Sequence, residues 1–374
     1  MKKTENDTLE NGEEEYYYHW LYQIPGIGKI SLKKALLIMT PQQIFEEGTE
    51  MLRDILSEKQ CSSIEQNRNM EKFLKDKEQL IKDKIYITHF GGEGYPKKLL
   101  HIPDPPLILY CKGKKGLWDC PAIAVVGARN CSSYGKIMAK ELGIQLARNG
   151  IITVSGMAKG IDGICQWHTL EAKEASIAVL GSGVQVCYPA ENYSLYERLQ
   201  KEGCLISEYP PYTKPAQGLF PPRNRIISGL ADILVVIEAR EKSGTLITVD
   251  MALEQGKEVY CIPGRTTDDL SRGCNQLIKM GAGIILSVSE FVEEICLEQK
   301  RIYHKTEILE KEIMGTTEEA VLKVLDSTPS FVEEIYENIK KGRKDMTLQN
   351  LMDILLELQL KGRVFQQGQY YYKE

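Results

Sequence analysis

The sequence predicts an α/β protein built around a doubly wound, mostly parallel β-sheet, with a small helical domain before the sheet and a winged-helix domain after it. Two observations predict the sheet. From residue 122 to residue 288, short β-branched runs alternate with helical patterns, which is typical of strands joined by crossover helices. Several of these runs are apolar throughout, as expected of central parallel strands that are covered on both faces. The length of 374 residues allows two or three domains.

Composition and charge describe a folded protein with an acidic first segment. Hydrophobic residues make up 43% and charged residues 26%, which excludes collagen-like repeats and wholesale disorder. Residues 1–15 hold two lysines and six acids, so they carry −4 of the net charge of −5, and we expect this tail to be disordered. Neither a membrane span nor a secretory signal is visible, so we expect a cytoplasmic protein. The ten cysteines include no CxxC pair, which favours reduced thiols over disulfides or a metal site.

Residues 16–81 are predicted to form a helical domain, because their apolar residues recur at three and four positions. Here LYQIPGIGKISLKKAL resembles a helix-hairpin-helix element. Its turn would present backbone amides and Lys29 to a DNA phosphate; the alternative is a plain turn between packed helices. Residues 82–290 are assigned to the sheet domain, and they begin with a connector rich in Gly, Pro and Tyr that has one short strand at LILY.

The remaining elements are expected in chain order. The strand runs are AIAVVG, IITVSG, SIAVLGSG, CLISEYP, DILVVIEA, VYCIPG and IILS, and helical patterns follow most of them. Residues 291–315 are charged and lack a strand signal, so they are expected to be a helix or linker. Residues 316–374 have the pattern of three helices followed by a two-stranded wing at RVFQQGQYYY, as in a winged helix.

Loops that follow the strands carry the candidate site, because open α/β sheets bind ligands at the carboxyl ends of their strands. The first loop, GARNCSSYG, is not GxGxxG and has Arg129 where the second glycine would be, which argues against a nicotinamide or flavin site. Arg129, Ser132 and a helix N-terminus would together bind an anion. The alternative is that Ser132 or Ser133 merely caps the helix. The second loop, SGMAKGIDG, adds Gly156 and Lys159.

The segment FPPRNR is the most informative. It places Phe220, Arg223, Asn224 and Arg225 at the start of a helix. Arginines that bind phosphate and a ring that stacks on a base suit a strand of nucleic acid. The alternative is that Phe220 packs in the core and the arginines pair with Glu208 or Glu238. A last loop places Ser243 and Gly244 at another helix N-terminus.

Catalytic patterns are absent from the sequence. No Walker A motif, HExxH or Ser/His/Asp spacing occurs, and His168 is expected to be structural or on the surface. A binding protein without cofactor or metal is therefore expected. The alternative is a Rossmann-like enzyme that cleaves nucleoside monophosphates, but the turn CIPGR lacks the second glycine and the Thr-x-x-Glu of such enzymes.

Seven ordered motifs resemble one family. GARNCSSYG, VSGMAKGIDG, AVLGSGVQVCYP, SEYPP, FPPRNRIISGL, SGTLITVDMALEQGKEV and CIPG…GCNQLIKMGA follow the pattern of the DNA-processing protein A (DprA, or Smf) family, from about Tyr95 to Val288. The resemblance implies an extended Rossmann-like domain, with a sterile-alpha-motif-like helical domain in front of it and a winged-helix domain behind it. It also implies a non-enzymatic protein of natural transformation that binds and protects single-stranded DNA, loads the RecA recombinase onto it and forms a homodimer.

The resemblance also carries over residues. It implies that the DNA site uses Arg129, Ser132, Gly156, Lys159, Phe220, Arg223, Asn224, Arg225, Ser243 and Gly244. Two positions depart from the family pattern: Gln166 replaces a usual His, and Ala175 replaces a frequent Lys, whose charge Lys173 would have to supply. Residues 121–290 hold 17 basic and 17 acidic residues, so Arg129, Lys159, Arg223 and Arg225 must converge on one crevice if the site is to attract DNA. The winged helix would bind DNA through KKGRK at 340–344 or serve as a protein-protein module.

Overall fold

The computed structural model describes residues 12–297, 317–325, 330–343, 346–360, 362–367 and 370–373. The chain divides into two compact units, Met1–Val292 and Glu293–Glu374. Most of the tail that is predicted to be disordered lies outside the described residues, but helix α1 begins at Glu13 and so includes its last three glutamates. Residues 288–297 are helical, and the rest of the predicted linker lies outside the described residues.

Five helices form the first part of unit 1. They are α1 (Glu13–Tyr22), α2 (Lys29–Leu36), α3 (Pro41–Glu47), α4 (Glu58–Asn67) and α5 (Met70–Lys82). Local capping explains several of their starts. Thr40 and Ser57 each form a capping box with a glutamine three residues later, and the Asn69 side chain caps α5.

A single sheet of nine strands forms the centre of the described part of unit 1, in the order β1-β2-β6-β5-β4-β3-β7-β8-β9. From β6 to β9 all neighbours are parallel, whereas β2 is antiparallel to both β1 and β6. The mostly parallel α/β sheet is thus confirmed, with one strand, β1, that the sequence patterns do not predict. The strands are β1 (Tyr86–His89), β2 (Ile108–Gly113), β3 (Ala122–Gly127), β4 (Ile152–Ser155), β5 (Ser176–Val179), β6 (Cys204–Ser207), β7 (Ile233–Ile237), β8 (Glu258–Cys261) and β9 (Gly283–Ile284).

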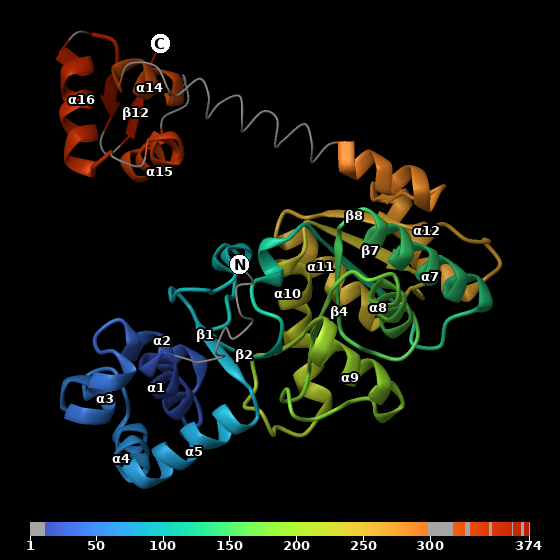
Figure 1. Cartoon of the computed structure of the whole chain (residues 1–374), viewed down its shortest axis with the longest axis horizontal. Helices are drawn as coiled ribbons and strands as arrows, with labels where there is room; N and C mark the ends of the chain where they lie inside the picture. The colour runs from blue at the N-terminus through green and yellow to red at the C-terminus, as the bar shows by residue number, and fades with distance from the viewer. Residues whose placement is uncertain are drawn as a thin grey trace, which may run out of the picture. The chain divides into compact units, whose positions relative to one another are not determined.

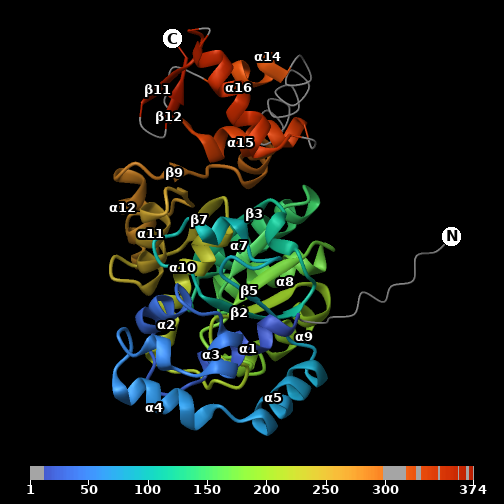
Figure 2. The same cartoon turned by 90° about the vertical axis from the view of Figure 1, so that its left-hand side faces the viewer.

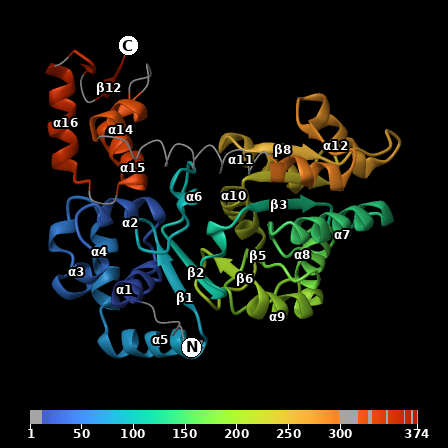
Figure 3. The same cartoon turned by 45° about the horizontal axis from the view of Figure 1, so that its top comes forward.

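Helices cover both faces of the sheet. Figure 3 shows α7 (Ser133–Arg148), α8 (Ile161–Glu171) and α9 (Tyr193–Glu202) on one face and α10 (Phe220–Leu230) and α11 (Gly244–Glu254) on the other. The chain moves outward from β3 through β4, β5 and β6, and then returns to β7 on the other side of β3. This reversal creates a switch point at the carboxyl ends of β3 and β7, the place where such sheets bind ligands. Two further helices of the sheet region are α6 (Lys97–Leu100) and α12 (Asp269–Lys279), and 3-10 turns lie at Glu50–Leu52, Leu117–Asp119, Ala190–Asn192 and Gln217–Leu219.

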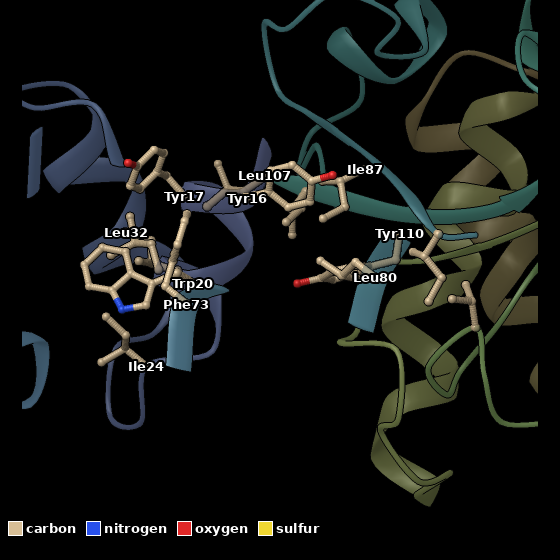
Figure 4. Close-up of a cluster of buried hydrophobic side chains, with 14 of the residues drawn as sticks. Tyr16, Tyr17, Trp20, Ile24, Leu32, Phe73, Leu80, Ile87, Leu107 and Tyr110 are labelled. Carbon is tan, nitrogen blue, oxygen red and sulfur yellow. The ribbon is translucent and has the colours of Figure 1, made fainter. Parts of the chain in front are cut away.

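The helical region and the sheet share one hydrophobic core. Helices α1 to α5 lie beside the β1–β2 end of the sheet (Figure 1), and Figure 4 shows side chains of both regions in the same cluster. Tyr16 and Trp20 from α1 belong to this cluster together with Ile87 of β1 and Tyr110 of β2. The buried His19 Nδ1 lies 2.9 Å from the Tyr110 hydroxyl. The predicted domain boundary at residue 81 therefore crosses a continuous core.

Charged side chains join the same two regions, and we call Lys29, Asp104, Glu208 and Arg225 the seam cluster; Glu208 and Arg225 are buried. The Arg225 guanidinium donates to both Glu208 carboxylate oxygens, at 2.9 and 2.8 Å. Lys29 Nζ lies 2.5 Å from Glu208 Oε1 and 3.4 Å from Asp104 Oδ2. Because Lys29 is engaged in these ion pairs, the turn before α2 is better explained as a turn between packed helices than as a phosphate-binding hairpin.

Unit 2 consists of α14 (Thr317–Val324), β10 (Ser330–Phe331), α15 (Val332–Gly342), α16 (Leu348–Leu360), β11 (Phe365–Gln367) and β12 (Tyr370–Tyr372). Its strands pair in the order β10-β12-β11, and Figure 2 shows the β11–β12 hairpin beside the three helices. Three helices followed by a hairpin is the element order of a winged helix. Its own core includes Val321, Ile335, Leu351 and Tyr371.

Candidate functional site

A cavity of about 480 Å³ opens at the switch point of the sheet. We call it the switch-point cavity. The ends of β3 and β7, the start of α10 and the start of α11 supply its walls. Of the ten predicted site residues it is lined by Arg129, Phe220, Arg223, Asn224, Ser243 and Gly244. The loops after these strands therefore converge as predicted, although four of the predicted residues do not line the cavity.

Arg129 and Phe220 present their side chains at the cavity. Arg129 is exposed on the loop after β3, and no carboxylate of the described residues lies within ion-pair distance of it. Phe220 is half-buried, with its ring against the backbone of Gly181 and 5.4 Å from the ring of Tyr188. The two interpretations of Phe220, a ring packed in the core and a ring that stacks on a base, are therefore compatible, because the ring packs on one side and lines the cavity on the other.

Arg223 is a buried part of the cavity wall. Its Nη1 donates to the backbone oxygens of Gly156, at 3.0 Å, and of Val179, so it joins the carboxyl ends of β4 and β5. Burial lowers the pKa of the Arg223 guanidinium to about 10, while Asp162 acts in the opposite direction; the group is still charged at neutral pH. Burial raises the pKa of Asp162, against the influence of Arg223. Gly156 fits here because a Cβ atom would lie 2.6 Å from Arg223 Nη2.

The N-terminus of α11 faces the cavity. Ser243 caps this helix by accepting from the Thr245 amide at 3.2 Å, and a Cβ added to Gly244 would meet open space. Two further cations line the same wall, the exposed side chains of Arg240 and Lys242. We did not predict them, although both follow the strand run DILVVIEA directly and the carboxyl end of a strand was the signal used elsewhere.

Ser132 has the capping role that the sequence offered as the alternative to anion binding. Its hydroxyl caps α7 by accepting from the Gly135 amide at 3.1 Å. The Glu238 carboxylate accepts from the Ser132 amide at 2.8 Å and from its hydroxyl. A protein carboxylate thus already occupies the anion site at the start of α7. Glu238 adopts this position with a φ of 55°, a left-handed conformation that is uncommon for Glu.

Arg225 and Lys159 do not line the switch-point cavity either. Arg225 is buried in the seam cluster, where Glu208 neutralises it, so the prediction that it converges with the other cations is wrong, and the alternative pairing with Glu208 is the observed one. Lys159 is exposed on the loop after β4. That loop borders the cavity through Ala158 and Asp162, so Lys159 lies at its margin.

The two departures from the family pattern are explained by packing. Gln166 is fully buried; its side chain accepts from the Met157 amide at 3.1 Å and donates to the Ile177 oxygen at 3.0 Å. It therefore joins the loop after β4 to strand β5. Ala175 and Lys173 precede β5 at its amino end, whereas the cavity lies at the carboxyl ends, so Lys173 is not placed to replace a cation there.

Other side-chain chemistry is sparse. His168 Nδ1 lies 2.7 Å from a Glu171 carboxylate oxygen, outside the switch-point cavity. Among the described residues no cluster of three His, Cys, Asp or Glu side chains could hold a metal ion. In the same residues no helix has the length and apolar character needed to cross a membrane. The ten cysteines are free.

Comparisons with known proteins agree on one family. A family model described as DNA recombination-mediator protein A matches residues 86–296. The DNA processing protein DprA of Bacillus subtilis is 43% identical over 212 residues, which cover 56% of this chain and 71% of the relative. Protein Smf of Synechocystis is 32% identical over 303 residues, covering 77% and 74%.

Two solved structures are similar as well. DNA processing protein A from Streptococcus pneumoniae superposes with a TM-score of 0.60 at 34% identity, over 79% of this chain and 99% of that one. The Helicobacter pylori protein, whose structure is described for its single-stranded DNA binding mode, has a TM-score of 0.53 at 30% identity, over 57% and 96%. With the family model covering more than half of its residues, this chain belongs to the DNA-processing protein A family.

Proposed function

We propose that this protein binds single-stranded DNA in the switch-point cavity. One observation carries the proposal: four cationic side chains, Arg129, Arg223, Arg240 and Lys242, line one cavity together with the ring of Phe220. The domain as a whole has balanced charge, so this local concentration of positive charge is what would attract a polyanion. The similar H. pylori protein is described as binding single-stranded DNA.

The cavity suggests how the strand is held. Phosphates would contact the exposed guanidinium and ammonium groups and the free end of α11, where Ser243 and Gly244 lie. A base would stack on Phe220. Phosphate contacts carry no sequence information, so binding should tolerate any sequence and weaken as salt rises. We assign supporting roles to the remaining predicted residues. Ser132, Gly156 and Arg225 hold the loops in position, and Lys159 and Asn224 would lie at the edge of the bound DNA strand.

A binding role fits the cavity better than a catalytic one. Its only acidic lining residue is Asp162, which is held by the Gly156 amide at 3.2 Å and lies near Arg223. No histidine or second carboxylate lines the cavity beside it, so the paired groups of a nucleotide hydrolase are missing there.

The first test compares Arg129→Ala with the wild type. Arg129 is exposed and free of ion pairs in the described structure, so its loss should weaken oligothymidylate binding roughly tenfold at low salt without affecting folding. The slope of log K against log salt concentration should also become shallower by about 0.7, the value for one phosphate contact on single-stranded DNA. Fluorescence anisotropy of labelled oligomers, single- and double-stranded, measures both quantities.

Arg148→Ala is the matched control. Arg148 is an exposed cation in the last turn of α7 and does not line the cavity, so its loss should leave binding almost unchanged. Equal affinities for Arg129→Ala and the wild type, or equal losses in both variants, would contradict the assignment of the cavity.

We also propose that the protein acts in the cytoplasm during natural transformation, as a homodimer that protects the incoming strand and loads RecA onto it. The relatives named DNA processing protein DprA support this role. RecA should assemble on oligothymidylate faster with the protein than without it, and Arg129→Ala should reduce that gain. An assembly rate that only falls as protein is added would contradict RecA loading while leaving DNA binding intact.

A further inference from the structure

A second cavity, of about 250 Å³, lies between α8 and the start of α9. We call it the Trp167 cavity. Its walls include Gly160, Trp167, His168, Glu191 and Ser194. None of these residues belongs to the predicted DNA site, and the switch-point cavity shares none of them.

The two cavities are neighbours, separated by the loop after β4. Ala158 lines the first cavity and Gly160 the second. Gly160 has a φ of 83°, and a Cβ atom added to it would lie 2.4 Å from the backbone oxygen of Arg129. The rim of the second cavity is thus in direct contact with Arg129, which lines the first. Glycine is needed at position 160 because of this close approach and the positive φ.

Lys159 stands between the two cavities. Its side chain is exposed, and within the described ranges no carboxylate pairs with it. The loop that carries it is held firmly, because the Asn192 side chain donates to the backbone oxygens of Met157, at 2.9 Å, and Ala158, at 3.1 Å. A phosphate that leaves the switch-point cavity over this loop would meet an exposed cation that no described carboxylate neutralises.

Trp167 gives the second cavity an aromatic wall. The indole is half-buried against the core, and the guanidinium of Arg198 lies 4.8 Å from its ring centroid. An aromatic ring that is held in place and still lines a cavity is a stacking surface for a base. Glu191 on the opposite wall would repel a phosphate, so the cavity favours an uncharged ring, with the phosphate outside at Lys159.

We infer that single-stranded DNA continues from the switch-point cavity across Lys159 and places an unpaired base in the Trp167 cavity. This inference rests on the proposed function and adds a second base subsite to it. The subsite makes the affinity of the protein depend on the length of the strand, because only a strand that is long enough reaches the second cavity.

Tryptophan fluorescence tests the contact directly. The chain has three tryptophans, and the other two, Trp20 and Trp118, are 7% and 4% exposed. Oligothymidylate should therefore quench the emission of Trp167 alone. Quenching should persist in Trp118→Phe and disappear in Trp167→Phe. Binding measured by anisotropy without any quenching in the wild type would overturn the inference.

A blocking variant tests the dependence on length. Ser194 is exposed at the rim of the cavity, so Ser194→Phe should fill the cavity without disturbing the core. Wild-type affinity should rise about fivefold or more over a series of oligothymidylates at the length that reaches the cavity. Ser194→Phe should lose that rise and keep the affinity for the shortest oligomer, whereas Lys201→Phe, an exposed position on the same helix, should behave as the wild type.

The outcomes separate the two proposals. If no oligomer binds the wild type, the proposed function itself fails. If oligomers bind and Ser194→Phe follows the wild type at every length, DNA binding stands and the second subsite is wrong.

Discussion

Arg223 and Arg225 stand two positions apart in FPPRNR, and the fold uses them differently. Arg223 forms part of the cavity wall, while Arg225 pairs with Glu208 in the seam cluster. Residues two apart on a helix point to different sides of it. Once the segment is placed in a helix, the two arginines are therefore not expected to face the same cavity. The helix itself was predictable from the sequence. The sequence offered Glu208 and Glu238 as alternative partners of the arginines. It could not decide between these carboxylates and a DNA phosphate for Arg225, because Glu208 follows strand β6, a separate element.

His19 shows how burial sets a charge state. Gln23 Nε2 donates to His19 Nε2 at 2.8 Å, which leaves the ring proton on Nδ1, 2.9 Å from the Tyr110 hydroxyl. Protonating Nε2 would put two donors against each other. Burial lowers the pKa of His19 to about 4, and Lys72 acts in the same direction.

The stability of the protein should therefore depend on pH through His19. Because its pKa is lower in the folded chain, the full contribution is present above about pH 6.5 and is lost as the pH falls toward 4, by roughly 3 kcal/mol in all. Urea unfolding between pH 7 and pH 4 measures it. The decline should be smaller in His19→Gln than in the wild type, and the exposed His101→Gln should keep the wild-type slope. Parallel slopes in all three proteins would show that His19 is not the responsible group.

At the scale of elements, the N-termini of α7 and α11 lie at the same edge of the sheet, and of these two the N-terminus of α11 is the one that remains open to a ligand. Glu238 occupies the start of α7, whereas the start of α11 lines the cavity. The sequence predicts both helices, and it offers a serine cap for the first as an alternative to anion binding. It could not distinguish the two N-termini, because the residue that closes the first, Glu238, follows β7, more than a hundred positions later. Strand β1 was not predicted for a related reason: YITH is a short run within a Gly- and Pro-rich stretch and pairs with β2 across a loop.

Ser132→Ala should therefore affect folding more than DNA binding. The variant loses the cap of α7 and the hydroxyl that donates to Glu238, which should lower the free energy of unfolding by about 1–2 kcal/mol. Urea denaturation measures the loss, and anisotropy should give a DNA affinity within about twofold of the wild type. A large loss of affinity in a protein of unchanged stability would return Ser132 to the DNA site.

At the scale of the whole molecule, the acidic net charge does not describe the surface that matters. The net charge of −5 coexists with a cavity lined by four cations. A second surface, at the sheet edge formed by β9, is apolar instead of charged. The exposed fractions of its side chains are 73% for Met280, 46% for Ile284 and 80% for Leu286. An edge strand with exposed apolar side chains is suited to pairing with a second copy, and we propose it as the contact surface of the proposed homodimer.

Leu286→Arg tests this surface. A charge at the centre of an apolar contact should convert the dimer to a monomer at micromolar concentrations, as measured by size-exclusion chromatography with light scattering. Leu37→Arg is the control, since Leu37 is 86% exposed near the end of α2. A monomeric wild type would contradict the dimer itself, and a dimeric Leu286→Arg would place the contact elsewhere.

The core that joins the helical region to the sheet also limits how this protein can change over evolutionary time. Tyr110 of β2 lies among side chains of α1, and Arg225, next to the cavity residues, shares Glu208 with Lys29. A gene exchange that replaced the first 81 residues with those of a distant relative would leave these partners mismatched. The helical region and the sheet should therefore be inherited together, whereas unit 2, which has its own core, can be gained, lost or replaced without that cost.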